Sequence, residues 1–198
     1  MPPRVAALLA GGGGTRFDGP THKLLAPLQG HLVWEHALAH VSAAGFDHVI
    51  IVTGAVPLAI SREAAGPPHV DVRHNPRWRS GQASSLQVAV HAADELGADG
   101  VTIGLADQPF VTAEAWRAVA DAPADCRIAI ATYQGTPGPN PVRLHRSVWP
   151  YLPTEGDEGA RGLLRLHPEW LCHVPCLGSL DTVADIDTTE DLHRWKSS

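Results

Sequence analysis

The sequence predicts an α/β protein in which helices cover both faces of a mainly parallel central sheet, giving three layers. Short apolar runs alternate with helix-patterned segments along the whole chain. Glycine, proline and small polar residues follow several of these runs, as expected where a strand ends in a loop. The chain has 198 residues, 44% hydrophobic and 18% charged, so we expect one soluble domain over residues 1–198.

The expected strands are short apolar or alternating runs bounded by turn residues. The run HVIIVT, for example, ends at Gly54, and VTIGL leads into ADQPF. In chain order the expected strands are Arg4–Leu9, His48–Thr53, Val70–His74, Val101–Leu105, Ile128–Tyr133 and Trp170–Val174. The segment GTPGPNP, residues 135–141, is rich in glycine and proline and is expected to be a loop.

The expected helices have apolar residues on one face or recognisable start and stop residues. In Leu32–Ala44 the apolar positions share a face and Gly45 supplies a stop, while Thr112 is a suitable cap for Ala113–Ala120. The other expected helices are Pro57–Ala65, Ser84–Leu96, segments near His145–Leu152 and Gly159–His167, and a last short helix to Trp195 opened by a capping box at Thr188-Thr189-Glu190-Asp191.

The overall composition excludes several classes of protein. A net charge of −6 is unfavourable for a general nucleic-acid binder, since phosphate contacts need clustered Lys and Arg. No apolar run approaches membrane length and no signal-peptide pattern opens the chain, so we expect a cytoplasmic protein with no membrane contact. Cys126, Cys172 and Cys176 are too few for a disulfide framework, and we expect them to be core or surface thiols in a reducing compartment.

The glycine-rich loop Gly11–Gly14 follows the first expected strand and leads to Arg16 and Lys23. It lacks the G-K-S/T ending of a Walker loop and does not fit the Rossmann G-x-G-x-x-G spacing. Glycines allow backbone N–H groups to approach an anion closely, and Arg16 and Lys23 add positive charge suited to a triphosphate. A tight turn with two surface cations is the alternative that the loop alone leaves open.

Two further segments lie after expected strands and therefore at the same edge of the sheet. Asp107, in ADQPF, is a natural Mg²⁺ ligand, and Asp185 or Asp187, on one side of an extended segment, can supply a second carboxylate. Residues 74–86, HNPRWRSGQASSL, present small polar groups suited to a base or ribose. The structural alternatives are a turn aspartate at Asp107, a helix start at Asp187 and a helix cap at Ser84 or Ser85.

Four motifs, in the same order over the whole length, resemble the molybdenum cofactor nucleotidyltransferases, and most closely their cytidylyltransferase branch. The segments NPRWRSG…SSL, ADQP, GDEGAR and DIDTTEDL resemble that branch's N-x-x-W-x-x-G…S-S-L, D-Q-P, G-D-x-G-A-R and D-I-D-T-x-E-D-L. The resemblance implies a three-layer αβα fold of the GT-A nucleotidyltransferase type. It also implies transfer of a nucleoside monophosphate from an NTP, with CTP expected, to the phosphate of molybdopterin or molybdenum cofactor, releasing pyrophosphate.

The resemblance assigns expected roles to particular residues of this chain. The catalytic residues would be Arg16, Lys23 and Asp107. Mg²⁺ would be held by Asp107 and Asp187. The nucleotide would be bound by Leu9, Ala10, Gly11, Gly12, Arg16, Lys23, Asn75, Gly81, Ser84 and Ser85. The acceptor would lie near Gln108, Pro109, Asp157 and Arg161. The implied partners are the nucleoside triphosphate, a molybdopterin-type cofactor, and a molybdoenzyme or its chaperone.

The sequence departs from the cytidylyltransferase pattern at three informative positions. Gly11 and Gly14 replace the alanine and serine of L-A-A-G-x-S-x-R, and Asn140 stands where that branch commonly has histidine before proline. Gly11 is closer to the guanylyltransferase form, and GGGTR, residues 12–16, resembles the G-x-G-T-R of sugar-phosphate nucleotidyltransferases. GTP as donor, a sugar phosphate as acceptor, and a non-catalytic cofactor-binding chaperone are therefore alternative functions.

Overall fold

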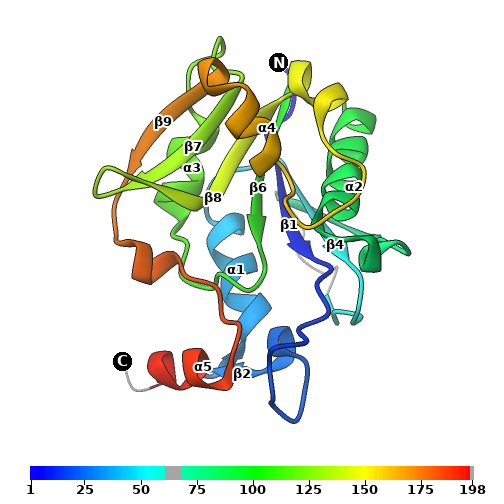
Figure 1. The fold of residues 1–198 in the computed structure, drawn as a ribbon, viewed down its shortest axis with the longest axis vertical. Helices are drawn as coiled ribbons and strands as arrows, with labels where there is room; N and C mark the ends of the chain where they lie inside the picture. Colours follow the sequence, from blue (N-terminus) through cyan, green and yellow to red (C-terminus); the bar gives the residue numbers. More distant parts are fainter. Residues whose placement is uncertain (61–67, 197–198) are drawn as a thin grey trace.

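A seven-stranded sheet runs through the middle of the structure, a computed structural model that describes residues 1–60 and 68–196 (Figure 1). Its strand order is β5-β4-β1-β6-β8-β7-β9, and only β8 runs antiparallel to its neighbours. The strands are β1 Val5–Ala10, β4 His48–Thr53, β5 His69–His74, β6 Gly100–Leu105, β7 Ile128–Tyr133, β8 Thr136–His145 and β9 Leu171–Cys176. This confirms the expected mainly parallel α/β sheet.

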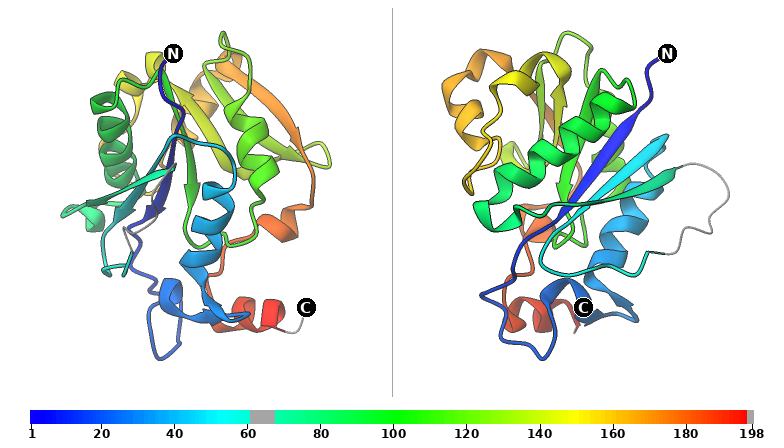
Figure 2. Two further views of the ribbon diagram at one scale, coloured as in Figure 1. Left: turned by 180° about the vertical axis from the view of Figure 1, so that it is seen from behind. Right: turned by 90° about the vertical axis from the view of Figure 1, so that its right-hand side faces the viewer.

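Helices cover both faces of the sheet, as Figure 2 shows. They are α1 Val33–Ser42, α2 Gln82–Glu95, α3 Ala113–Ala120, α4 Arg161–Leu166 and α5 Thr189–Lys196. The alternating side chains of the fully buried strand β1 separate two cores: Leu8 packs in the cluster that contains α1 and α3, and Leu9 in the cluster that contains α2 and α4. A buried parallel strand flanked by two helix layers explains the continuous apolar run at this position.

The helix ends follow the polar residues expected from the sequence. Thr112 accepts a hydrogen bond from the Ala115 N–H and begins α3. Thr188 and Asp191 exchange hydrogen bonds in a capping box, with the Asp191 N–H donating to Thr188 Oγ1 and the Thr188 N–H donating to Asp191 Oδ2. This cap anchors α5, as does a tilted contact between the Trp195 and Phe110 rings, with ring centroids 4.4 Å apart. The helix thereby anchors one end of the preceding segment, which carries Asp185 and Asp187.

A small hairpin of β2 Pro27–Leu28 and β3 His31–Leu32 and several 3-10 helices complete the fold. The 3-10 helices are Lys23–Leu25, Trp78–Ser80, Arg146–Tyr151, Pro168–Trp170 and Leu180–Val183. Within residues 1–60 and 68–196, no helix combines the length and the apolar character needed to cross a lipid bilayer.

The structure corrects two expectations about secondary structure. The expected loop over residues 135–141 forms the first half of β8, which extends from Thr136 to His145. Its prolines, Pro137, Pro139 and Pro141, lie outside residues 142–145, which pair with residues 100–103 of β6. Their missing N–H groups therefore interrupt no hydrogen bonds to β6. Residues 57–60 of the expected helix Pro57–Ala65 are not helical, and the rest of that helix lies outside the described residues.

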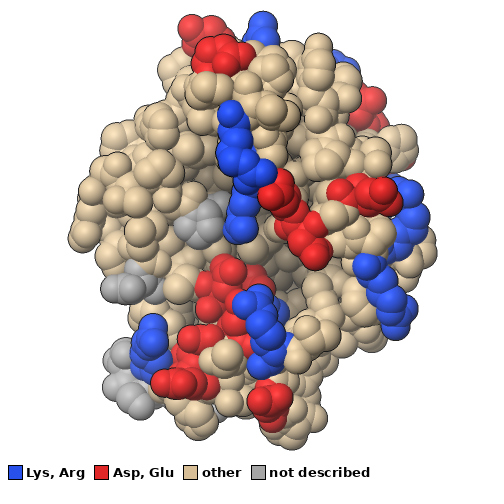
Figure 3. Space-filling model, in the orientation of Figure 1, with Lys and Arg blue, Asp and Glu red and all other residues tan. Residues whose placement is uncertain are grey.

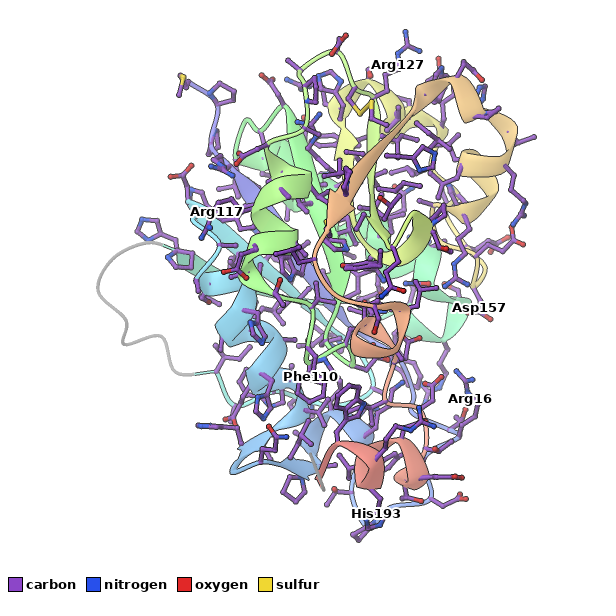
Figure 4. All side chains as sticks on the ribbon, turned by 90° about the vertical axis from the view of Figure 1, so that its left-hand side faces the viewer. Arg16, Phe110, Arg117, Arg127, Asp157 and His193 are labelled. Carbon is purple, nitrogen blue, oxygen red and sulfur yellow. A yellow bond between two sulfur atoms is a disulfide. The ribbon has the colours of Figure 1, made fainter. Side chains whose placement is uncertain are left out.

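The expectation that all three cysteines are thiols is wrong for two of them. Cys126 and Cys172 form a disulfide, visible as the yellow bond near Arg127 in Figure 4, and Cys176 is free. Cys126 precedes β7 and Cys172 lies in the neighbouring parallel strand β9, where it pairs with Ala129. The two residues are 46 positions apart in the chain, and sheet pairing alone brings them together.

Candidate active site

A cleft of about 630 Å³ opens at the carboxyl edge of the sheet, beyond the ends of β1 and β6. Figure 3 shows this face hollowed near its centre, with acidic and basic side chains next to one another. The cleft is lined by Leu9, Gly11, Gly12, Gly13, Thr15, Arg16, Lys23, Trp78, Arg79, Gly81, Gln82, Ser85, Leu105, Asp107, Asp157, Asp185 and Asp187. The structure therefore brings the glycine loop, both of its cations and the expected carboxylates together.

Close neighbours leave no room for side chains at Gly11 and Gly13 of the glycine loop. A Cβ on Gly11 would lie 2.7 Å from Ser85 Oγ, and a Cβ on Gly13 would lie 3.1 Å from the Trp78 ring. Nothing lies within 4 Å of the position that a Cβ on Gly12 would take, so this residue leaves its backbone open to the cleft. The loop thus packs against Trp78 on one side and presents backbone to a ligand on the other.

His22 fixes the far side of the same loop. Its Nε2 lies 3.0 Å from the Gly12 carbonyl oxygen, and its Nδ1 lies 3.3 Å from the Leu24 nitrogen. A carbonyl only accepts and a backbone N–H only donates, so these contacts select the neutral ring with the proton on Nε2. Burial lowers the pKa of His22, with a smaller contribution from the charge of Lys23, which favours the same neutral form.

Lys23 joins the two carboxylates that were expected to hold a metal ion. Its Nζ lies 2.6 Å from Asp107 Oδ2 and 2.7 Å from Asp187 Oδ1, and its side chain is only 10% exposed. Burial disfavours the charged ammonium, but the charges and hydrogen bonds of Asp107 and Asp187 outweigh it and raise the pKa of Lys23. Arg16 is 74% exposed and contacts Asp187 Oδ2 at 2.8 Å, so it reaches the same acidic pair from the rim.

Asp185 is a third carboxylate in the cleft, on the same side of its segment as Asp187. The residue between them, Ile186, is fully buried, and its N–H donates to the Asp107 carbonyl at 2.9 Å. Alternation along an extended segment therefore turns both aspartates to the cleft, as the sequence predicted. Burial and the charge of Asp107 raise the pKa of Asp185, whose Oδ1 accepts a hydrogen bond from Gln108.

Four expected nucleotide-binding residues follow β5, and the structure places only two of them on the cleft wall. Gly81 and Ser85 line the cleft. Asn75 and Ser84 are almost fully buried behind it, where the Asn75 amide donates to both Ser84 Oγ and Ser85 Oγ at 2.8 and 2.9 Å. These hydrogen bonds make Asn75 the support of the wall rather than part of its surface.

The GDEGA segment packs against the start of α2 and adds Asp157 to the cleft lining. Gly81, the cap of α2, has a φ of 102°, and a Cβ there would lie 2.4 Å from the Gly156 carbonyl oxygen. The Gly156 N–H donates to the Ser80 carbonyl, and the Gly156 carbonyl accepts from the Ala83 N–H. Asp157 is thereby held at the start of α2, and Figure 4 shows it on the same side of the molecule as Arg16.

The remaining expected residues lie away from the cleft. Ala10 is buried in the core below the glycine loop, and Pro109 follows Gln108 in the turn after β6. Gln108 is 1% exposed and faces Asp185, so it does not line the cleft as an acceptor-binding residue would. Arg161 lines a separate cavity of about 50 Å³ that shares Leu9 and Gln82 with the cleft.

Several cleft residues were not assigned a role from the sequence. Trp78 and Arg79 belong to the quoted NPRWRSG motif and form a cation–π pair, with the Arg79 guanidinium carbon 4.3 Å from the ring centroid. Their place in that motif was the sequence signal that could have identified Trp78 and Arg79 as cleft residues. Thr15 and Gln82 also lie in quoted segments, GGGTR and HNPRWRSGQASSL, whereas Leu105 carries no comparable signal beyond its place at the end of a strand.

The carboxylates of the cleft fit a hard divalent cation. Asp107 Oδ1 is buried and has no hydrogen-bond partner, and Asp107 Oδ2 and Asp187 Oδ1 converge on one ammonium group. No group of three or more His, Cys, Asp or Glu side chains with metal-site geometry occurs in the described part of the chain. Mg²⁺ usually needs only one or two protein carboxylates and completes its shell with phosphate and water.

A glycine loop, two cations and a group of carboxylates at the carboxyl edge of a parallel sheet define an α/β nucleotidyltransferase site. A family model described as the MobA-like NTP transferase domain matches residues 6–171. The chain therefore belongs to the MobA-like NTP transferase family, which confirms the family expected from the four motifs.

Individual relatives agree with this assignment. The purine catabolism protein PucB of Bacillus subtilis is 31% identical over 200 residues, covering 94% of this chain and 93% of PucB. The bifunctional protein GlmU of Caulobacter vibrioides is 32% identical over 114 residues, which cover 56% of this chain and only 24% of GlmU.

Solved structures share the fold over the full length. Rv0371c of Mycobacterium tuberculosis superposes with a TM-score of 0.81 at 27% identity, over 99% of this chain and 98% of that one. Mth528, a nucleotidyl transferase from Methanothermobacter thermautotroptrophicus, gives a TM-score of 0.79 at 25% identity, over 100% and 97% of the two chains. The chain is thus a nucleotidyltransferase with the expected α/β fold.

Proposed function

We propose that this nucleotidyltransferase transfers CMP from CTP to the terminal phosphate of molybdopterin or molybdenum cofactor and releases pyrophosphate, with Mg²⁺ as its cofactor. The observation that carries the proposal is the convergence of the glycine loop, Lys23 and the acidic pair Asp107 and Asp187 in one cleft. The preference for CTP and for this acceptor rests on the four motifs shared with the cytidylyltransferase branch.

In the proposed reaction an acceptor phosphate oxygen attacks the α-phosphorus of CTP. The new P–O bond forms as the bond to the leaving pyrophosphate breaks. The nucleophile is already an anion, so the protein needs no general base. The open backbone at Gly12 cradles phosphate oxygens, and Arg16 and Lys23 neutralise the triphosphate and the leaving group. Asp107 and Asp187 would hold Mg²⁺, which neutralises phosphate charge and orients the reacting groups when it is bound.

Phosphate binding requires the cations of the cleft to change partners. Lys23 contacts two carboxylates, and Arg16 contacts one of them. A divalent cation at Asp107 and Asp187 would take over these carboxylate oxygens and leave both side chains free for phosphate. Before the substrate binds, Lys23 and Arg16 balance the charge of the carboxylates. After it binds, they would balance the charge of its phosphates.

A second candidate acceptor is a sugar phosphate. The GGGTR segment, residues 12–16, resembles the G-x-G-T-R of sugar-phosphate nucleotidyltransferases. A non-catalytic chaperone is the other alternative. Pyrophosphate release distinguishes the two, because only an enzyme releases pyrophosphate from the nucleotide.

The first test is a thermal-shift panel of CTP, GTP, UTP, ATP and dTTP, each with and without Mg²⁺. A ligand at about 100 times its Kd stabilises the folded state by roughly 2.7 kcal/mol. We expect the largest Mg²⁺-dependent shift with CTP, followed by pyrophosphate release when molybdopterin is added. A larger shift with GTP would contradict the CTP preference, and full activity of Lys23→Ala would contradict the phosphate-binding role of the loop.

A further inference from the structure

Two buried amides and a buried phenol lie directly behind the carboxylates of the cleft, and the proposed reaction gives them no role. Gln108 and Tyr133 are each 1% exposed, and Asn140 is 8% exposed. They come from the turn after β6, from β7 and from β8, so three separate segments meet at this point. Buried polar groups of this kind are normally hydrogen-bonded, and here the bonds form one continuous chain.

The chain of hydrogen bonds ends on Asp185. The Gln108 Nε2 donates to Asp185 Oδ1 at 2.6 Å, and the Asn140 Nδ2 donates to Gln108 Oε1 at 3.0 Å. The Tyr133 hydroxyl donates to the Asn140 backbone carbonyl at 3.1 Å. We call Asn140, Gln108 and Asp185 the amide relay.

The polarity of the amide relay follows from its last member. An ionised carboxylate only accepts hydrogen bonds, so Gln108 must turn its NH₂ group to Asp185 and its carbonyl oxygen away. That oxygen in turn requires a donor, which the Asn140 amide supplies. A residue at position 140 without a donor would therefore disturb Asp185, although it does not touch it.

Asp185 belongs to the same acidic group as Asp107 and Asp187. The Ile186 N–H donates to the Asp107 carbonyl at 2.9 Å, so the backbone already ties the two segments together. The Gln108 contact adds a second link and engages Asp185 Oδ1, which leaves the other carboxylate oxygen for a ligand in the cleft. Partners that orient a carboxylate near a metal typically change metal affinity or activity 10–100-fold when they are removed.

We propose that Gln108 and Asn140 are positioning residues of the metal–nucleotide site, and that they act by holding Asp185 toward the cation and the phosphates. The proposal rests on the proposed metal-dependent function and adds Asp185 to the groups that serve it. It also gives a reason for the departure at position 140. A histidine ring N–H, common at this position in the cytidylyltransferase branch, is a donor like the Asn140 amide.

Four substitutions test the relay and its polarity. Gln108→Leu removes the central amide. Asn140→Asp replaces the donor by an acceptor, which turns the Gln108 amide around and sets its carbonyl against Asp185. Asn140→His keeps a donor. Tyr133→Phe is the control, because it removes a hydrogen bond to the Asn140 backbone and keeps the relay.

The measurement is the affinity for Mn²⁺·CTP by titration calorimetry, with circular dichroism as the check on folding. We expect Gln108→Leu and Asn140→Asp to weaken binding at least about tenfold. The variant that combines Gln108→Leu with Asn140→Asp should bind no more weakly than Gln108→Leu alone, since both substitutions break the same relay. Asn140→His and Tyr133→Phe should stay within about threefold of the unmodified protein.

Wild-type affinity in folded Gln108→Leu or Asn140→Asp would overturn the proposal, as would an equal loss in Asn140→His. If Gln108→Leu does not fold, Gln108→Asn replaces it, because the shorter side chain keeps the amide but cannot span both partners. If the unmodified protein prefers another nucleotide, the CTP assignment fails and the same comparison is made with that nucleotide. If the unmodified protein binds no nucleotide, the proposed function fails. The relay is then tested by measuring the affinity for Mn²⁺ alone, with each relay substitution added to Lys23→Met, and a loss of about tenfold is again expected.

Discussion

Each of the two edges of the central sheet holds one cation, buried Lys23 at the carboxyl edge and partly buried Arg143 at the amino edge, and the two cations have different partners. At the carboxyl edge, Lys23 is paired with the carboxylates of Asp107 and Asp187, which lie in an open cleft. At the amino edge, the Arg143 guanidinium donates to the backbone carbonyls of Ala120, Ala122, Pro123 and Cys126 at 2.7–3.4 Å. Burial disfavours the charged form of both side chains. At Lys23 the charges and hydrogen bonds of Asp107 and Asp187 outweigh burial and raise the pKa, whereas at Arg143 burial lowers the pKa.

In the proposed function, this difference distinguishes a cation of the site from a structural cation. A divalent cation would take over the carboxylate partners of Lys23 and leave the lysine free to bind phosphate. Backbone carbonyls have no such alternative, since their positions are set by the loop that Arg143 holds together. The nearby disulfide Cys126–Cys172 ties the same loop to β9 and makes this edge more rigid. We therefore expect function at the edge where the cation has exchangeable partners.

The largest expected effect is at the carboxyl edge. Asp107→Asn keeps the size of the side chain but removes the charge that the metal and Lys23 require, so turnover should fall about 10²–10³-fold, or roughly 2.7–4 kcal/mol of transition-state stabilisation. Steady-state pyrophosphate release measures it. Asp99→Asn, at an exposed position remote from the cleft, is the matched control and should keep full turnover. Near-normal turnover of Asp107→Asn would exclude its metal role.

The second effect is at the amino edge and concerns stability instead of turnover. Arg143→Met removes the donors to four carbonyls, three of them in part-buried hydrogen bonds, so we expect a loss of about 1–2 kcal/mol in the free energy of unfolding. Urea titration followed by circular dichroism measures it. Turnover of the folded variant should remain within about twofold of the unmodified protein. A variant that is stable but inactive would show that the two edges are not functionally separate.

The third prediction addresses the exchange of partners at Lys23. Lys23→Met removes the ammonium between Asp107 and Asp187, so Mn²⁺ without nucleotide should bind about tenfold more tightly, a gain of about 1.4 kcal/mol. Electron paramagnetic resonance of the free ion measures the affinity. Arg146→Met, which changes a surface ion pair far from the cleft, should leave Mn²⁺ affinity unchanged. Equal Mn²⁺ affinity in Lys23→Met and in the unmodified protein would contradict the exchange.

The smallest effect is a pH dependence at His22. Its pKa is lowered in the folded protein, mainly by burial, from an ordinary value of about 6.5. The stabilisation by the neutral ring is therefore complete above about pH 6.5 and decreases as the pH falls through that value toward the folded-state pKa. We expect the difference in unfolding free energy between the unmodified protein and His22→Gln to shrink from pH 8 to pH 5. A difference that grows on acidification would reverse this assignment.

Local pattern was sufficient for the regular elements and for part of the site. The buried strand before the glycine loop, the Thr112 cap and the capping box at Thr188 follow from neighbouring residues, and the structure has all of them. The parallel sheet places the carboxyl ends of β1 and β6 at one edge, so the gathering of the glycine loop and Asp107 there was also predictable. The direct contact of Lys23 with Asp107 was not predicted. The expected loop over residues 135–141 was wrong, because β8 begins at Thr136. Proline is tolerated in a strand where its missing N–H faces no partner strand, and the proline content of the sequence does not show where that is.

The sequence by itself determined the fold class, the family and the residues that carry charge to the cleft, because these depend on periodicity and on short motifs. Only the tertiary structure decided which of them face the ligand. Asn75, Ser84 and Gln108 have side chains suited to binding, yet they are buried behind the wall and support Ser85 and Asp185. The Cys126–Cys172 bond and the amide relay likewise join segments far apart in the chain. The spacing of residues along a chain does not encode such contacts, since they arise from how strands pair and how a turn packs beneath them.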